Sequence, residues 1–253
     1  MDITLDLLKC LLSGRVGEAS RIIDVVLPTV GRPTLWPLVA SLVASPVAAH
    51  VYVVDDRRDG LPLQVPGATV LRGPGRGPAA ARNVGWRAST VEWVAFVDDD
   101  VVLGPRWHDD LADDIGRAGP DVAATFGRIR VPLPAERRPT DWERNVSGLE
   151  RACWATADAA YRRAALEAVG GFDERFPRAY REDADLALRA RAAGWRLVNG
   201  ERTVLHPVRP APWWVSIRMQ AGNADDALMR PSTARDGEHV RAPRRAASAP
   251  TWW

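Results

Sequence analysis

Residues 93–100 read Trp-Val-Ala-Phe-Val-Asp-Asp-Asp, an apolar run that ends at once in three carboxylates. The apolar run predicts a buried strand. Adjacent carboxylates at the end of such a strand raise one another's pKa unless a cation lies nearby. A divalent ion such as Mg²⁺ or Mn²⁺ would relieve that repulsion, because hard cations take oxygen ligands. An acidic turn or a helix cap is the alternative interpretation.

Strand alternation directs Asp98 and Asp100 to one side of the chain and Asp99 to the other. Further apolar runs alternate with helical segments, which predicts an α/β fold with a mostly parallel central sheet flanked by helices. In such sheets ligands bind at the carboxyl ends of the strands. Asp55 and Asp56 follow another strand and fit this rule. We expect strands at 21–29, 51–54, 68–71, 93–97, 122–131 and 203–205, and helices at 34–45, 79–88, 105–118, 164–169 and 182–193.

Other polar residues lie at element ends, each with a plainer alternative. The loop Gly73–Pro78 opens a helix that carries Arg82, which could reach a base or a phosphate or could be an exposed surface arginine. Glu182 and Asp183 begin another helix, where carboxylates act as caps or dipole partners but also as a general base. His206 follows the last predicted strand, and is either a structural histidine or a metal ligand.

Composition excludes several kinds of chemistry. Lys9 is the only lysine among 34 Lys and Arg residues, so a phosphate-loop lysine and a Schiff-base lysine in the body of the chain are excluded. Any phosphate must therefore be bound by arginine, by backbone N–H groups or by a metal. A net charge of +2 gives no support for nucleic-acid binding. Cys10 and Cys153 lie far apart without a CxxC motif, which favours reduced thiols and a cytoplasmic location.

The sequence divides into four parts. We expect a helical N-terminal extension at 1–21, one domain at 22–207, a C-terminal helix at 208–230 and a disordered tail at 231–253. The extension lacks the features of a secretory signal. Tryptophans in the C-terminal helix predict packing on the core or, alternatively, a peripheral contact with the inner face of the plasma membrane.

Six segments in order resemble the family 2 glycosyltransferases, which have the GT-A fold. The resemblance implies a hexosyltransferase-like enzyme that moves a sugar from a nucleoside-diphosphate sugar to an acceptor hydroxyl, with Mg²⁺ or Mn²⁺ and with inversion. The acceptor would be a sugar, a lipid-linked compound or a small molecule. The enzyme would take part in the synthesis of cell-envelope glycans. The segments, within about residues 22–207, are VVLPTVGRPTLWPLVASL, VYVVDD, GPAAARNVGW, VAFVDDDVVLGPRW, AAYRRAALEAVGGFDERF and REDADLALRARAAGW.

The resemblance also implies roles for individual residues. Asp183 matches the catalytic aspartate, and only one of Asp55 and Asp56 is expected to contact the base. Arg57 and Arg58 follow these two aspartates where the family usually has Gly-Ser, which leaves the ribose contacts open. The remaining implied roles are metal binding for Asp98, Asp100 and His206, nucleotide binding for Pro28, Thr29, Asp55, Asp56, Arg82 and Asp99, and acceptor or sugar contacts for Asp158 and Glu182.

Two rival functions share parts of this pattern. A sugar nucleotidyltransferase has the same layout and metal carboxylates, but it usually carries a lysine near the first strand, where this chain has Arg21 and Arg32. A non-catalytic nucleotide-sugar-binding protein is the other rival. The presence of Asp98, Asp100 and Asp183 together argues against it.

Overall fold

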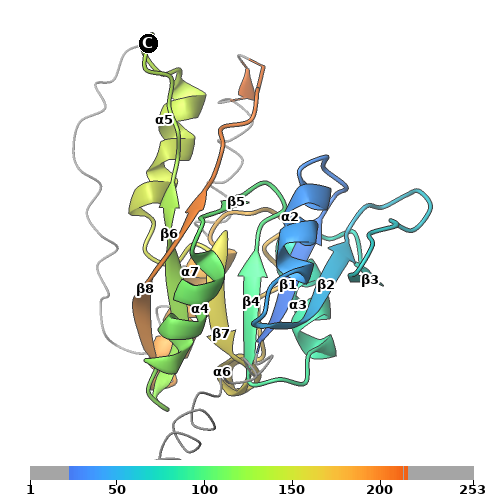
Figure 1. Cartoon of the computed structure of the whole chain (residues 1–253), viewed down its shortest axis with the longest axis vertical. Helices are drawn as coiled ribbons and strands as arrows, with labels where there is room; N and C mark the ends of the chain where they lie inside the picture. The colour runs from blue at the N-terminus through green and yellow to red at the C-terminus, as the bar shows by residue number, and fades with distance from the viewer. Residues whose placement is uncertain (1–22, 213, 216–253) are drawn as a thin grey trace, which may run out of the picture.

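Eight strands form one sheet in the order β3-β2-β1-β4-β7-β6-β8-β5, and helices pack on both of its faces (Figure 1). The computed structural model describes residues 23–212, 214 and 215. The strands are β1 (Ile23–Thr29), β2 (Ala48–Asp55), β3 (Thr69–Arg72), β4 (Trp93–Val97), β5 (Val102–Leu103), β6 (Val122–Arg130), β7 (Asp158–Arg162) and β8 (Arg196–Leu205). The helices are α2 (Leu35–Val43), α3 (Pro78–Ala88), α4 (Trp107–Gly116), α5 (Asp141–Ser147), the 3₁₀ turn η1 (Gly148–Arg151), α6 (Arg163–Val169) and α7 (Glu182–Ala192).

The sheet is mostly parallel, as the sequence predicts. Strands β1 to β4 pair in parallel, and β6 pairs in parallel with β8. Strand β7 lies between β4 and β6 and runs antiparallel to both, and β5 runs antiparallel to β8. Strands β5 and β7 and helix α5 lie outside the predicted elements, and only the last residues of β8 were predicted as a strand.

Alternation along β1 supplies the cores on both sides of the sheet. Val25 and Leu27 belong to the cluster that includes residues of α2 and α4, whereas Val26 belongs to the cluster with residues of α3 and α7. Helix α3 approaches β1 closely at Gly85, where an added Cβ would lie 2.2 Å from a methyl carbon of Val26. The two buried faces hold the strand ends, and hence the polar residues that follow them, in fixed positions.

A buried arginine on β8 links that strand to β6, β7 and α4. Arg202 on β8 is fully buried and donates from Nε to Asp158 on β7 at 2.8 Å and from Nη1 to Asp114 on α4 at 3.0 Å. It also donates to the side chain and the carbonyl of Thr125 on β6. One guanidinium therefore links three strands and a helix, which compensates the cost of burying its charge.

The two terminal parts fall largely outside the described residues. The predicted N-terminal helix, the tail and most of the predicted C-terminal helix lie there, so these predictions stay untested. Among the helices that the structure describes, none is both long and apolar enough to cross a membrane.

Candidate active site

A cleft of about 600 Å³ opens at the carboxyl ends of β1 and β4. Pro28 and Thr29 line it from β1, and the three aspartates that follow β4 form its floor. The segment of α5 and η1 forms one wall, and residues 177–183, which lead into α7, form the opposite one. The position follows the rule for open α/β sheets, in which ligands bind beyond the carboxyl ends of the strands.

Asp98, Asp100 and His206 gather at the floor of the cleft. One ligand atom from each side chain can be chosen so that all three lie within 4.8 Å of one another. The backbone N–H of His206 donates to the carbonyl of Arg130 at the end of β6 at 2.8 Å, and His206 Nε2 lies 3.5 Å from Asp100 Oδ1. Carboxylate oxygens and an imidazole nitrogen are a donor set that Mg²⁺ and Mn²⁺ accept, so the residues fit a divalent cation.

Asp99 lies on the other side of the chain, as strand alternation predicts. Its buried carboxylate accepts a hydrogen bond from Thr29 Oγ1 at 2.5 Å and forms an ion pair with Arg32. Thr34 Oγ1 donates to the Asp99 carbonyl at 2.6 Å. Burial raises the pKa of Asp99 despite these partners. Asp99 therefore ties the β4 end to the loop after β1 and shapes the cleft.

Arg82 connects the two carboxylate groups of the cleft. It is 1% exposed, so the alternative of a surface arginine is wrong. Nη2 donates to Asp98 Oδ1 at 2.7 Å and Nη1 donates to Glu182 Oε1 at 2.9 Å. The guanidinium also lies over the ring of Phe172, 5.5 Å from its centroid. Arg82 thus joins the floor of the cleft to the start of α7.

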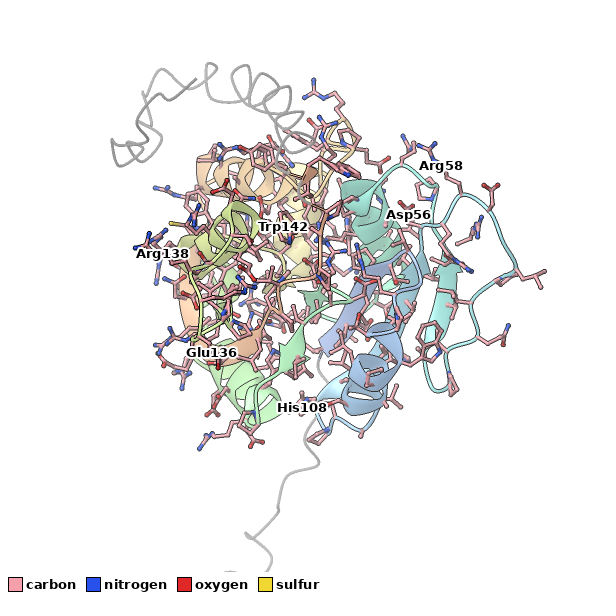
Figure 2. All side chains as sticks on the ribbon, turned by 90° about the horizontal axis from the view of Figure 1, so that it is seen from above. Asp56, Arg58, His108, Glu136, Arg138 and Trp142 are labelled. Carbon is pink, nitrogen blue, oxygen red and sulfur yellow. The ribbon has the colours of Figure 1, made fainter. Side chains whose placement is uncertain are left out.

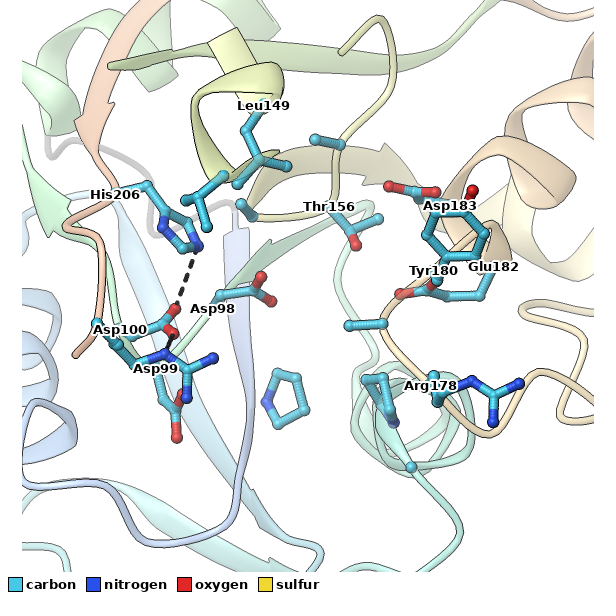
Figure 3. Close-up of a pocket in the computed structure, with 18 of the residues that line it drawn as sticks. Asp98, Asp99, Asp100, Leu149, Thr156, Arg178, Tyr180, Glu182, Asp183 and His206 are labelled. Carbon is cyan, nitrogen blue, oxygen red and sulfur yellow. Dashed lines mark ion pairs between the residues drawn. The ribbon is translucent and has the colours of Figure 1, made fainter. Parts of the chain in front are cut away.

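Glu182 and Asp183 begin α7 and face the cluster of Asp98, Asp100 and His206 across the cleft (Figure 3). Arg181 precedes them in the left-handed conformation, with a φ of 74°, and so turns the chain sharply into the helix. Burial, and then the neighbouring charge of Asp183, raises the pKa of Glu182 to about 7. Burial also raises the pKa of Asp183, whose Oδ1 accepts from the backbone N–H of Ala184 at 2.7 Å.

The structure distinguishes Asp55 from Asp56. Asp55 is buried and forms two hydrogen bonds of 2.8 Å with Arg57, which lower its pKa. Asp56 lines the cleft, and its carboxylate accepts from the backbone N–H groups of Gly75 and Gly77. Of the two, Asp56 is thus the one placed to meet a ligand.

Asp158 lies in the core and not at the cleft. The expectation was a contact with sugar or acceptor, but the carboxylate is fully buried and does not line the cleft. It accepts from Arg202 and, at 3.0 Å, from Trp107 Nε1. The expectation is wrong because β7, which begins at Asp158, turns that side chain into the core. The other predicted residues at the cleft are Pro28, Thr29, Asp56, Arg82, Asp98, Asp99, Asp100, Glu182, Asp183 and His206.

Sequence reasoning also missed residues that line the cleft. Arg209 donates from Nε to Asp100 Oδ2 at 3.1 Å, and Arg32 pairs with Asp99. Trp142 and Leu149 contribute from α5 and η1. The missed signal for α5 is the Thr140–Glu143 pair, a capping box that precedes an apolar stripe.

The family model described as Glycosyl transferase family 2 matches residues 24–170. The chain belongs to this family. It is 33% identical over 135 residues to a pre-mycofactocin glycosyltransferase of Mycobacterium tuberculosis, a match that covers 48% of this chain. Only 28% of that relative's length is matched.

Solved structures of glycosyltransferases confirm the expected GT-A fold. A mannosyltransferase of Pyrobaculum calidifontis, in complex with GDP-Man and Mn²⁺, matches with a TM-score of 0.58 and 22% identity over 86% of this chain and 65% of that one. Glucosyl-3-phosphoglycerate synthase of Mycobacterium tuberculosis, in complex with Mn²⁺, UDP-Glc and phosphoglyceric acid, matches with a TM-score of 0.58 and 16% identity. That match covers 86% of this chain and 81% of the other.

Proposed function

We propose that this chain is a metal-dependent glycosyltransferase that moves a sugar from a nucleoside-diphosphate sugar to an acceptor hydroxyl, with inversion. The observation that carries the proposal is the pairing, in one cleft, of the cluster of Asp98, Asp100 and His206 with the carboxylate of Asp183 opposite. Family membership supports it, as do related folds solved with GDP-Man or UDP-Glc and Mn²⁺.

The donor would lie on the floor of the cleft. Asp98, Asp100 and His206 would hold Mg²⁺ or Mn²⁺, which when bound supplies positive charge against the leaving diphosphate. Pro28, Thr29 and Asp56 would line the nucleotide site, and Asp99 would support it through its bond with Thr29. The only lysine, Lys9, precedes the described domain, so arginines are the side-chain cations of this site.

Asp183 would act as the general base. Its carboxylate accepts the proton of the acceptor hydroxyl while that oxygen forms a bond to the anomeric carbon. The bond between the anomeric carbon and the diphosphate oxygen breaks, and the electron pair leaves with the nucleoside diphosphate. Attack from the face opposite the leaving group inverts the configuration. A pKa raised by burial makes the ionised Asp183 a stronger base than an exposed aspartate.

Glu182 would contact the transferred sugar or the acceptor. Its Oε1 is held by Arg82, whereas its buried Oε2 has no hydrogen-bond partner among the described residues. A sugar hydroxyl is a suitable donor for that oxygen. Arg82 is occupied by two carboxylates, so we now assign it the role of positioning them. A role in cell-envelope glycans, a cytoplasmic location and a peripheral membrane contact stay predictions from the sequence.

A donor-turnover assay tests the proposal. Nucleoside-diphosphate sugars with GDP, UDP or other bases are incubated with Mn²⁺ or with EDTA, and the products are separated. The proposal expects free sugar or glycoside together with nucleoside diphosphate, and loss of this turnover with EDTA. Release of pyrophosphate would instead identify a nucleotidyltransferase, and binding without any product would identify a non-catalytic protein.

A further inference from the structure

Three apolar side chains on α5 and η1 recur at helical spacing and line the cleft. Trp142, Val146 and Leu149 are separated by four and three residues, which places them on one face of the segment. Val146 is buried in the core, whereas Trp142 and Leu149 stay partly exposed. An apolar helical face is normally covered by another element. Here Trp142 and Leu149 pack against the core cluster on one side and border the cavity on the other, together with Val146.

This apolar wall is held in place by polar contacts. Trp142 Nε1 donates to the carbonyl of Arg209 at 2.8 Å, which fixes the indole against the segment after β8. Thr140 and Glu143 form a capping box at the start of α5. Glu150 Oε1 accepts from the backbone N–H of Val131 at 2.9 Å and anchors η1 to the end of β6. A surface fixed in this way loses little conformational freedom when a ligand binds.

The wall borders the same cleft as Asp98, Asp183 and His206. Seen from above, Trp142 lies towards the centre, whereas Glu136 and Arg138 of the preceding loop lie at the outer edge (Figure 2). In the close-up, Leu149 lies between His206 and Thr156 at the margin of the cavity (Figure 3). An acceptor whose hydroxyl reaches the opposite carboxylates would therefore place its body along this wall.

We propose that the wall of Trp142, Val146 and Leu149 binds an apolar body of the acceptor, an aliphatic or aromatic group attached next to the hydroxyl that is glycosylated. This inference rests on the proposed function and names its acceptor class. A donor sugar is the other possible occupant of the wall, but its ring carries hydroxyls that need polar partners. The one polar atom of the three side chains, Trp142 Nε1, is already bonded to Arg209.

Calorimetry with two matched glucosides tests the inference. Methyl β-D-glucoside and n-hexyl β-D-glucoside, which share a head group, are titrated into the full chain in the presence of Mn²⁺ and a nucleoside diphosphate that binds. The inference expects the hexyl compound to bind at least about tenfold more tightly, because its added methylenes leave water. Equal affinity of the two compounds, or binding of neither, would overturn the inference.

Two variants test whether the wall causes the difference in affinity between the two glucosides. Leu149→Asn, which keeps the side-chain size but adds an amide, should abolish most of the difference between the two glucosides. Leu133→Asn, at a leucine that is 37% exposed outside the cleft, should keep it. Retention of the full difference in Leu149→Asn would place the apolar contact elsewhere. Weaker binding of a nucleotide sugar in Leu149→Asn, with unchanged binding of its nucleoside diphosphate, would assign the wall to the donor sugar and would also overturn the inference.

A separate result distinguishes failure of the inference from failure of the proposed function. If no nucleoside diphosphate binds in the presence of Mn²⁺ and no nucleotide sugar is turned over, the proposed function itself fails. If nucleoside diphosphate binds and the glucosides are not discriminated, the function stands and only the apolar acceptor class is wrong.

Discussion

Arg82 donates to Glu182 across 2.9 Å inside the protein, and both side chains are almost fully buried. The same guanidinium holds Asp98, so a single cation balances one carboxylate from each side of the cleft. A buried ion pair contributes modestly as a unit, but the loss of one partner leaves an uncompensated charge. The integrity of the cleft therefore depends on this arginine.

Replacement of Arg82 by Gln should lower the free energy of unfolding by about 3–5 kcal/mol, because Glu182 and Asp98 lose their cation. Urea unfolding followed by circular dichroism measures this. Arg87→Gln on the same helix is the matched control. Arg87 is exposed and should change stability by about 0.5 kcal/mol or less. Equal effects of the two variants would refute the bridging role.

Glu182 should make the stability of the protein depend on pH. Its folded-state pKa of about 7 lies above the ordinary value of 4.5, so the native state binds the proton more tightly than the unfolded state. The stabilisation from this proton is complete below about pH 4.5 and is lost as the pH rises towards 7. The Glu182→Gln variant should therefore gain stability relative to the wild type across that interval. A constant difference between the two unfolding curves would contradict the raised pKa.

Asp158→Asn should destabilise the protein without altering the donor site. The substitution weakens the buried pair with Arg202, and we expect a loss of about 3–5 kcal/mol. In the fraction that stays folded, the Kd for nucleoside diphosphate with Mn²⁺ should be unchanged, as calorimetry can measure. If the variant is as stable as the wild type but binds nucleoside diphosphate more weakly, Asp158 contacts the substrate after all.

Asp100→Ala should weaken the binding of Mn²⁺. Removal of one carboxylate from the cluster with Asp98 and His206 leaves two side-chain ligands, so the affinity should fall by about tenfold or more. Titration of Mn²⁺ by calorimetry measures the change. Asp110→Ala removes an aspartate of α4 that pairs with Arg106 outside the cleft, and it serves as the control. Unchanged Mn²⁺ affinity in Asp100→Ala would remove the metal assignment.

Much of the fold and part of the site follow from local sequence signals. The apolar runs that end in Asp55–Asp56 and Asp98–Asp100 predict strands, and the carboxyl-end rule predicts that these carboxylates share an edge. The short run of β7 was missed because its pairing with β4 and β6 joins segments distant in sequence. Local patterns do not report such pairings.

Local sequence patterns do not predict which single arginines are buried. Arg82 and Arg202 resemble ordinary surface residues of a helix and a strand, and only the assembled sheet supplies the carboxylates that neutralise them. The side chain of Asp158 is assigned correctly only once Arg202 is known to be its partner. The apolar wall of α5 and η1, in contrast, is visible as a capping box followed by apolar residues at helical spacing.

The most direct test of the central claim is the turnover of a nucleotide sugar by Asp183→Asn, with donor binding measured in parallel. Removal of the general base should lower kcat by about 10²-fold or more while the Kd for the donor with Mn²⁺ stays within about twofold. This outcome would place Asp183 in the chemical step of sugar transfer. An unchanged kcat with intact donor binding would contradict the assignment of Asp183 as the base and, with it, the mechanism proposed for this cleft.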